Sequence, residues 1–187
     1  MLTYWSVIDK LQNTAEEPDE KANELFNEFT NPLLLNGISS SDKIIISNIS
    51  GINIPSGATL EDVIIIAPYV SVSSGFEGSI QVFATDSIVL HSDCLLTYPS
   101  SLNLLVKEKG LPRIELKKGA KMRGVITAFN SSNEVSIPSI KINSSATVEG
   151  EIVSNGYVHL EGKVWGSVFC RSLIYNSGSI FYDNAIY

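Results

Sequence analysis

After residue 42, short apolar runs alternate with single glycines, aspartates and serines, a pattern that predicts many short strands. The clearest instance begins at Ile140 and continues through KINSSATVEGEIV. In this repeat the first residue, Ile140, is apolar, and so are the residues two and eight positions after it. A turn residue follows at position five, alanine at six, glycine at ten and a β-branched residue at twelve, all counted from Ile140. Seven copies of this skeleton, two of them shortened by two residues, start at Ile52, Val70, Ile88, Ile114, Ile140, Val158 and Leu173, with spacings of 18, 18, 26, 26, 18 and 15 residues.

Such repetition predicts an all-β fold, a single-stranded parallel β-helix of triangular section with about seven coils. Each copy supplies three short strands, with turn residues at its corners, and successive coils hydrogen-bond about 4.8 Å apart. The seven starting residues should form one inner ladder. A second ladder is expected from Leu60, Phe76, Leu96, Met122, Val148 and Val164. An antiparallel sandwich also has short, regularly spaced strands. Nothing in that fold, however, would require the same type of residue at the same position of all seven copies.

Residues 1–42 differ in character and predict a short α-helical cap on the β-helix domain, residues 43–187. Apolar residues recur every three positions from Leu2 to Leu11, which indicates an amphipathic helix. Pro18 and the acidic residues around it indicate the start of a second helix, and Pro32 lies just beyond its end. At the other end of the chain, SIFYDNAIY offers no polar cap. We therefore expect this end to associate with another chain, or the natural sequence to continue.

The two long spacings each carry eight extra residues at the same phase of the repeat, within residues 99–113 and 127–139. Insertions at one phase of neighbouring coils should place both loops on one side of the column. Function often collects on loops held by a rigid scaffold, so these loops predict a binding ledge. Simple surface decoration is the alternative. The most exposed candidates on the ledge are Lys107, Glu108, Lys109 and Asn130.

Composition narrows the function classes. The formal charge is −7, the pI is about 4.8 and no basic cluster is visible, which argues against nucleic-acid binding. No apolar run approaches the roughly 20 residues of a spanning helix, and the N-terminus lacks the pattern of an export signal. Cys94 and Cys170 have no metal-ligand spacing and are expected to be buried apolar residues. No cofactor is expected.

The sequence also offers little catalytic chemistry. His91 and His159 are expected to face solvent, and neither has a legible partner for general base catalysis. Asp62, Asp93 and Asp183 are expected at corners of distant coils, which does not make a two-carboxylate site. Left-handed hexapeptide acyltransferases carry a glycine at every corner of the coil, whereas here glycine marks one corner only. The chain is therefore not expected to be an enzyme.

The corner phrases FEGSI, MRGVI, VEGEI and VWGSV, alternating with halves such as IELKKGA, resemble those of bactofilins, bacterial polymer-forming cytoskeletal proteins. The likeness covers residues 44–187. It implies a right-handed β-helix without nucleotide or metal that assembles end to end and scaffolds membrane or wall-modifying partners. The implied assembly residues lie on the last coil: Leu173, Tyr175, Ile180, Phe181 and Tyr182. The 26-residue coils depart from the family pattern.

Three functions remain open. The first is a non-catalytic structural scaffold, whose partner is a second copy or another protein and which associates with the membrane or the cell wall. The second is an envelope or cell-surface binding module that uses the two inserted loops. The third is a carbohydrate-active β-helix enzyme, which would need a cleft lined by carboxylates and aromatic residues. The residues leave open whether the location is the bacterial cytoplasm, at the membrane, or the cell envelope.

Overall fold

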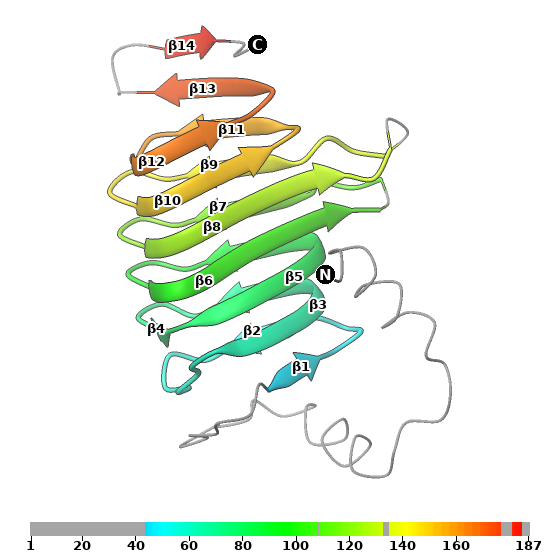
Figure 1. The fold of residues 1–187 in the computed structure, drawn as a ribbon, viewed down its shortest axis with the longest axis vertical. Helices are drawn as coiled ribbons and strands as arrows, with labels where there is room; N and C mark the ends of the chain where they lie inside the picture. The colour runs from blue at the N-terminus through cyan, green and yellow to red at the C-terminus, as the bar shows by residue number, and fades with distance from the viewer. Residues whose placement is uncertain (1–43, 108, 133–134, 177–180, 185–187) are drawn as a thin grey trace. The chain divides into compact units, whose positions relative to one another are not determined.

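The computed structural model describes residues 44–107, 109–132, 135–176 and 181–184, which all belong to one compact unit, Leu34–Tyr187. This part of the chain is all-β and contains no helix (Figure 1). The strands are β1 (Ile45–Ser47), β2 (Ile52–Ile54), β3 (Val63–Val72), β4 (Glu77–Gly78), β5 (Ile80–Leu90), β6 (Leu95–Val106), β7 (Arg113–Leu116), β8 (Lys121–Asn130), β9 (Ser139–Ile142), β10 (Thr147–Ser154), β11 (Tyr157–Leu160), β12 (Lys163–Phe169), β13 (Ser172–Asn176) and β14 (Phe181–Asn184). The expected helical cap lies outside the described residues.

The strands form one sheet in which neighbours are far apart in sequence, in the order β12-β10-β8-β6-β5-β7-β9-β11-β13-β14. Strands β1 and β2 both pair with β3, which pairs with β5, and β4 pairs with β6. Every pairing among the described strands is parallel except that of β13 with β14. Parallel rungs stacked in this way are consistent with a β-solenoid, and they exclude the antiparallel sandwich.

The first expected ladder is confirmed residue by residue. Six successive pairings join Ile52, Val70, Ile88, Ile114, Ile140, Val158 and Leu173 as direct partners in neighbouring strands. The central members of this ladder are completely buried. A second column of direct partners in neighbouring strands lies elsewhere on each rung. Its members have no exposed surface and are Ile65, Val82, Leu102, Ile126 and Ile152. Aliphatic side chains stacked at one phase therefore supply the continuous core.

The second expected ladder is confirmed from Leu96 through Met122 and Val148 to Val164, but its assignment of Phe76 is wrong by two residues. The direct partner of Leu96 in the preceding coil is Gly78. A β-carbon on Gly78 would lie 2.8 Å from Cζ of Phe76. The completely buried Phe76 ring therefore fills the space that a side chain at position 78 would occupy. The core stays closed, although the apolar residue stands two positions earlier in this coil than in the others.

Two rows of residues at the corners have positive φ. Turn residues at positions five and ten of the repeat predict such corners. At the first corner φ is 76° at Gly75, 59° at Asp93, 77° at Gly119 and 63° at Ser145. At the second corner Gly124, Gly150 and Gly166 are direct partners in neighbouring strands. Gly78, the glycine of FEGSI, does not belong to this second row, because it pairs with Leu96.

The chain from Leu173 to Asp183 does not form the like rung that the repeat predicts. Strand β14 turns back and pairs antiparallel with β13, so that Leu173 faces Asn184 and Tyr175 faces Tyr182. Asp183 consequently lies inside β14 and not at a corner. Figure 1 shows this hairpin at the C-terminal end of the column. The repeat of apolar residues could not distinguish a parallel rung from a hairpin, because strands in both carry side chains on alternate faces.

Candidate interaction surfaces

Two strands at the C-terminal end, β12 and β14, each have one edge that is unpaired within the described residues. Strand β12 pairs with β10 and with no other strand in the described part of the chain. Its inward residues Val164 and Val168 are only half-buried, whereas their partners Val148 and Ile152 in β10 have no exposed surface. The apolar column is therefore incompletely covered at this end. An edge strand with a partly exposed core is a template for pairing with another strand.

Two aromatic side chains stand on the outer face of the same strand. Trp165 is 68% exposed and Phe169 is 61% exposed. Neither residue was predicted from the sequence, because the phrase VWGSV indicates only a corner of the coil. Their signal is two large aromatic residues at the outward positions of the last corner phrase. The preceding copy carries Glu149 and Val153 at these positions, and the copy before it carries Arg123 and Thr127.

The residues expected to form the assembly end lie on the other half of this rung. Leu173 is half-buried between its partners Val158 and Asn184, and Tyr175 is 39% exposed. Phe181 and Tyr182 belong to β14, which covers the edge of β13. Ile180 lies outside the described residues. Their role in assembly stays a prediction, and among the described strands β14 and β12 each have one unpaired edge.

The predicted ledge is smaller than the sequence suggested. Strands β6 and β8 continue into the two insertions as far as Val106 and Asn130, so the loops shrink to residues 107–112 and 131–138. The two loops are joined, because Ser136 Oγ donates to the Gly110 carbonyl and accepts from the Gly110 N–H, each at 2.9 Å. The expectation that both insertions lie on one side is therefore confirmed.

The four candidate residues of the ledge differ in exposure. Lys109 is exposed, whereas Lys107 and Asn130 are half-buried. Asn130 is tied into the scaffold, since its N–H donates to Asn155 Oδ1 at 3.2 Å and its side-chain amide donates to the Ser132 carbonyl at 2.8 Å. Glu108 lies outside the described residues. Ligand binding by these residues stays a prediction.

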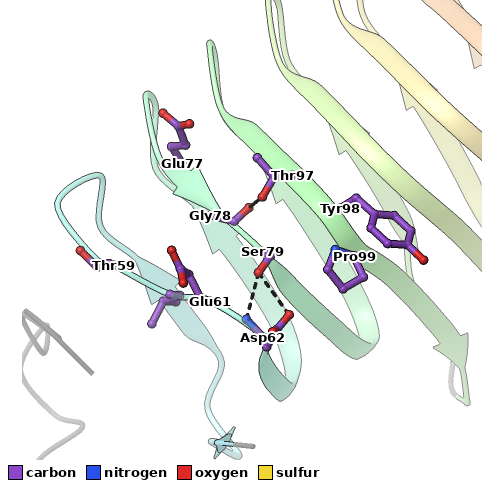
Figure 2. A pocket seen from close by; sticks show the side chains of 10 residues that line it. Thr59, Glu61, Asp62, Glu77, Gly78, Ser79, Thr97, Tyr98 and Pro99 are labelled. Carbon is purple, nitrogen blue, oxygen red and sulfur yellow. Dashed lines mark hydrogen bonds between the residues drawn. The ribbon is translucent and has the colours of Figure 1, made fainter. Parts of the chain in front are cut away.

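A groove of about 600 Å³ lies at the second corner of the first coils (Figure 2). The three coils that form the groove differ in the number of residues between the second ladder and the second corner. The middle coil has one residue there, Ser79. The coil before it has two, Glu61 and Asp62, and the coil after it has three, Thr97, Tyr98 and Pro99. The shorter coil becomes the floor and its longer neighbours become the two walls. In Figure 2, Gly78 and Ser79 lie between Glu61 and Asp62 on one side and Tyr98 and Pro99 on the other.

The groove combines carboxylates with an aromatic wall. Ser79 is buried and accepts a hydrogen bond from the Asp62 N–H at 2.9 Å, which anchors one wall to the floor. Tyr98 is 78% exposed. The Thr97 hydroxyl donates to the Gly78 carbonyl at 3.2 Å and fixes the other wall. Glu61, Asp62 and Glu77 line the groove, but no cluster of His, Cys, Asp or Glu that could hold a metal occurs among the described residues.

Both histidines are half-buried, less open than expected. His91 Nε2 lies 3.1 Å from Ser71 Oγ, which links the residue after the end of β5 to β3. Neither histidine lines the groove. The two cysteines are free. Cys94 is buried, as expected, whereas Cys170 is only half-buried. Burial raises the pKa of both thiols.

Comparison with known proteins found no matching family model, curated protein or solved structure. Within the described residues, no helix is long and apolar enough to cross a membrane.

Proposed function

We propose that the protein is a non-catalytic structural scaffold that assembles through the terminal coils of a β-solenoid, in the manner of the bactofilins it resembles. In this proposal the chain winds as a right-handed, triangular β-helix of about seven coils. Its partners are further copies of itself or another protein, at the membrane or the cell wall of a bacterium. The ladder from Ile52 to Leu173 supports the repeat on which that resemblance rests.

One observation carries the assembly role. The apolar column is closed in its interior coils, but at its C-terminal end Val164 and Val168 on β12 are half-exposed. Covering apolar surface is favourable by about 25 cal/mol for each Å² removed from water. A second chain that pairs with β12 would cover both valines. It would also supply hydrogen-bond partners for the backbone N–H and C=O groups at the edge of this strand.

Light scattering on the full chain after size exclusion, over a range of concentrations, tests this role. We expect oligomers that Val168→Asp disperses, whereas Val125→Asp leaves them intact. Val125 is the matched control, since it is 37% exposed on the outer face of the interior strand β8. Circular dichroism of both variants checks that the strands persist. A strict monomer at the highest concentration would contradict the assembly role.

A second candidate is a binding module that uses the inserted loops, supported by the paired hydrogen bonds between Gly110 and Ser136. Two insertions held to each other present one continuous surface on a rigid scaffold. Cosedimentation with purified peptidoglycan tests it. Replacing residues 131–138 by a short Gly-Ser turn should abolish cosedimentation and spare the oligomers. Retained cosedimentation would contradict this candidate.

A further inference from the structure

The groove at the second corner of the first coils has one wall that projects from the column. Residues 97–99 occupy an interval in which the coil before has only Ser79 and the coil after has only Arg123. The extra residues interrupt the register between β6 and β8, as in a β-bulge, and a bulge changes the direction in which a side chain points. Figure 2 shows the Tyr98 ring projecting from this wall beside Pro99. The wall therefore presents an aromatic ring at the rim of the groove.

The aromatic ring at the rim is open to a ligand. Tyr98 is 78% exposed, about twice as much as Tyr69, Tyr157 or Tyr175. An aromatic ring offers a large apolar face with an electron-rich surface. One face of a pyranose sugar ring consists of C–H groups, which pack well on such a surface. Tyr98 can therefore act as a platform for a sugar ring.

The remainder of the groove supplies hydrogen-bond acceptors. Glu61, Asp62 and Glu77 line it and are exposed, and each carboxylate can accept several hydrogen bonds. These carboxylates come from two successive coils, and in the described chain no three such groups lie close enough together to hold a metal ion. Acceptors that are spread along a groove suit a ligand with several hydroxyl donors better than a single point charge.

The floor of the groove adds a buried hydroxyl group. Ser79 Oγ accepts a hydrogen bond from the Asp62 N–H at 2.9 Å. The hydroxyl of Ser79 can itself donate to Asp62 Oδ1, but these atoms lie 3.5 Å apart, whereas O–H···O bonds are usually about 2.5–3.0 Å long. An oxygen atom of a ligand in the groove would offer this hydroxyl a better acceptor.

Charge and size limit the class of ligand. None of the described residues that line the groove is Lys, Arg or His, so the lining disfavours phosphates, nucleic acids and sugars that carry a carboxylate. The volume of about 600 Å³ falls within the roughly 300–1,000 Å³ of small-molecule sites. An aromatic platform, dispersed acceptors and the lack of a cation together favour a sugar without acidic groups.

We propose that the groove of Figure 2 is a binding site for an oligosaccharide of neutral or amino sugars. Tyr98 packs on the C–H face of one sugar ring, and the carboxylates of Glu61 and Glu77 accept hydrogen bonds from its hydroxyl groups. Ser79 donates a hydrogen bond from the floor. The inference goes beyond the scaffold role, because the groove includes neither the terminal coils nor the two inserted loops.

A glycan array tests the class of ligand. The fluorescently labelled full chain is applied to tetrasaccharides of glucose, mannose, galactose, N-acetylglucosamine, glucosamine and galacturonic acid. Isothermal titration calorimetry then measures the affinity of those that bind. We expect binding to at least one neutral or amino sugar and none to galacturonic acid. An array without binding, or with binding to galacturonic acid alone, would overturn the inference.

Point variants of the tyrosine locate the site. Tyr98→Ala should weaken binding at least about tenfold, as expected when an aromatic anchor is removed. Tyr98→Phe keeps the ring and should stay within about threefold of the unmodified chain. Tyr157→Ala is the matched control, since Tyr157 is an exposed tyrosine on β11 that does not line the groove. Binding that survives Tyr98→Ala would overturn the site, and circular dichroism checks that each variant is folded.

A carboxylate variant tests the opposite side of the groove. Glu77→Gln should weaken binding about fivefold, because a neutral amide accepts weaker hydrogen bonds than a carboxylate. Glu149→Gln is the matched control, an exposed carboxylate on β10 outside the groove. Equal effects of the two substitutions would contradict the role of the carboxylates.

A tetralysine peptide distinguishes the competing class of ligand. Carboxylates beside an aromatic ring can also hold an ammonium group through ion pairing and a cation–π contact. Tetralysine binding that Glu77→Gln weakens, together with an array that binds no sugar, would overturn the saccharide inference in favour of a cationic peptide. Light scattering separates this inference from the scaffold role: a strict monomer that binds sugars overturns only the scaffold role, and oligomers that bind none overturn only the saccharide site.

Discussion

Gly150 lies directly over Gly124, so close that a β-carbon on Gly150 would stand 1.9 Å from the Gly124 carbonyl oxygen. The φ of Gly150 is 146°, which side chains with a β-carbon rarely adopt. Backbone approach and backbone conformation therefore both require glycine at this corner. The repeated phrase with a central glycine is explained by this geometry.

Gly150→Ala should consequently lower the free energy of unfolding by about 2–4 kcal/mol, since it combines a clash with a strained φ. Gly57→Ala is the control, because a β-carbon on Gly57 would have nothing within 4 Å and the φ of Gly57 is not in the left-handed region. Its effect should stay within about 0.5 kcal/mol. Urea unfolding of both variants measures the difference. Equal stability of the two would contradict the stacked corner.

Phe76→Ala should be strongly destabilising, because the completely buried ring fills the column beside Gly78. Removing a buried phenylalanine side chain typically lowers the free energy of unfolding by about 3–5 kcal/mol. Tyr98→Ala is the matched aromatic control in the next coil, since Tyr98 is 78% exposed, and it should change stability by less than about 1 kcal/mol. Chemical unfolding monitored by circular dichroism measures both. If Phe76→Ala proved as mild as Tyr98→Ala, the packing described for this coil would be wrong.

Glu115 should make stability depend on pH. Burial acts to raise the pKa of Glu115, but hydrogen bonds from Lys117 and Asn143, whose side-chain nitrogens both lie 3.1 Å from Oε1, outweigh it and lower that pKa. A carboxyl with a lowered pKa in the folded state binds protons more readily when unfolded. Its stabilisation is therefore complete above the unfolded pKa of about 4.3 and is lost as the pH falls through the folded pKa.

Glu115→Gln should accordingly lower the free energy of unfolding by about 1 kcal/mol at pH 7 and by much less at pH 3. Thermal unfolding at the two pH values measures the difference. Glu149→Gln is the control, because its ion pair with Arg123 at 2.9 Å is exposed on both sides and should contribute little at either pH. A Glu115→Gln effect that is the same at both pH values would contradict the assignment.

Ser136→Ala should loosen the two inserted loops without unfolding the column. The hydroxyl group of Ser136 makes both hydrogen bonds to Gly110, and its loss should cost about 1 kcal/mol or less at this exposed site. Hydrogen exchange is the sensitive measurement: the Gly110 N–H should exchange faster, whereas the N–H of buried Ile126 should not change. Ser131→Ala, in the same loop, serves as the control. Unchanged exchange at Gly110 would show that the two loops are not joined in solution.

The sequence by itself determined the repeat and the residues that stack. One aliphatic residue at one phase, from Ile52 to Leu173, was sufficient to predict the ladder, because coils that pair in parallel must bring equivalent residues side by side. The corner glycines of the later coils could be predicted for the same reason. Their positive φ depends on the local backbone, and that local requirement appears directly in the residue type.

Only the tertiary structure decided where the repeat breaks. Phe76 and Gly78 exchange roles because a large ring can fill volume belonging to a neighbouring position, and the sequence does not show which way a side chain points. The extra residues around Asp62 and Tyr98 become the walls of a groove only because a shorter coil lies between them. Strand β14 turns back because pairing with β13 can be satisfied in either direction, and that choice leaves the edge of β12 open.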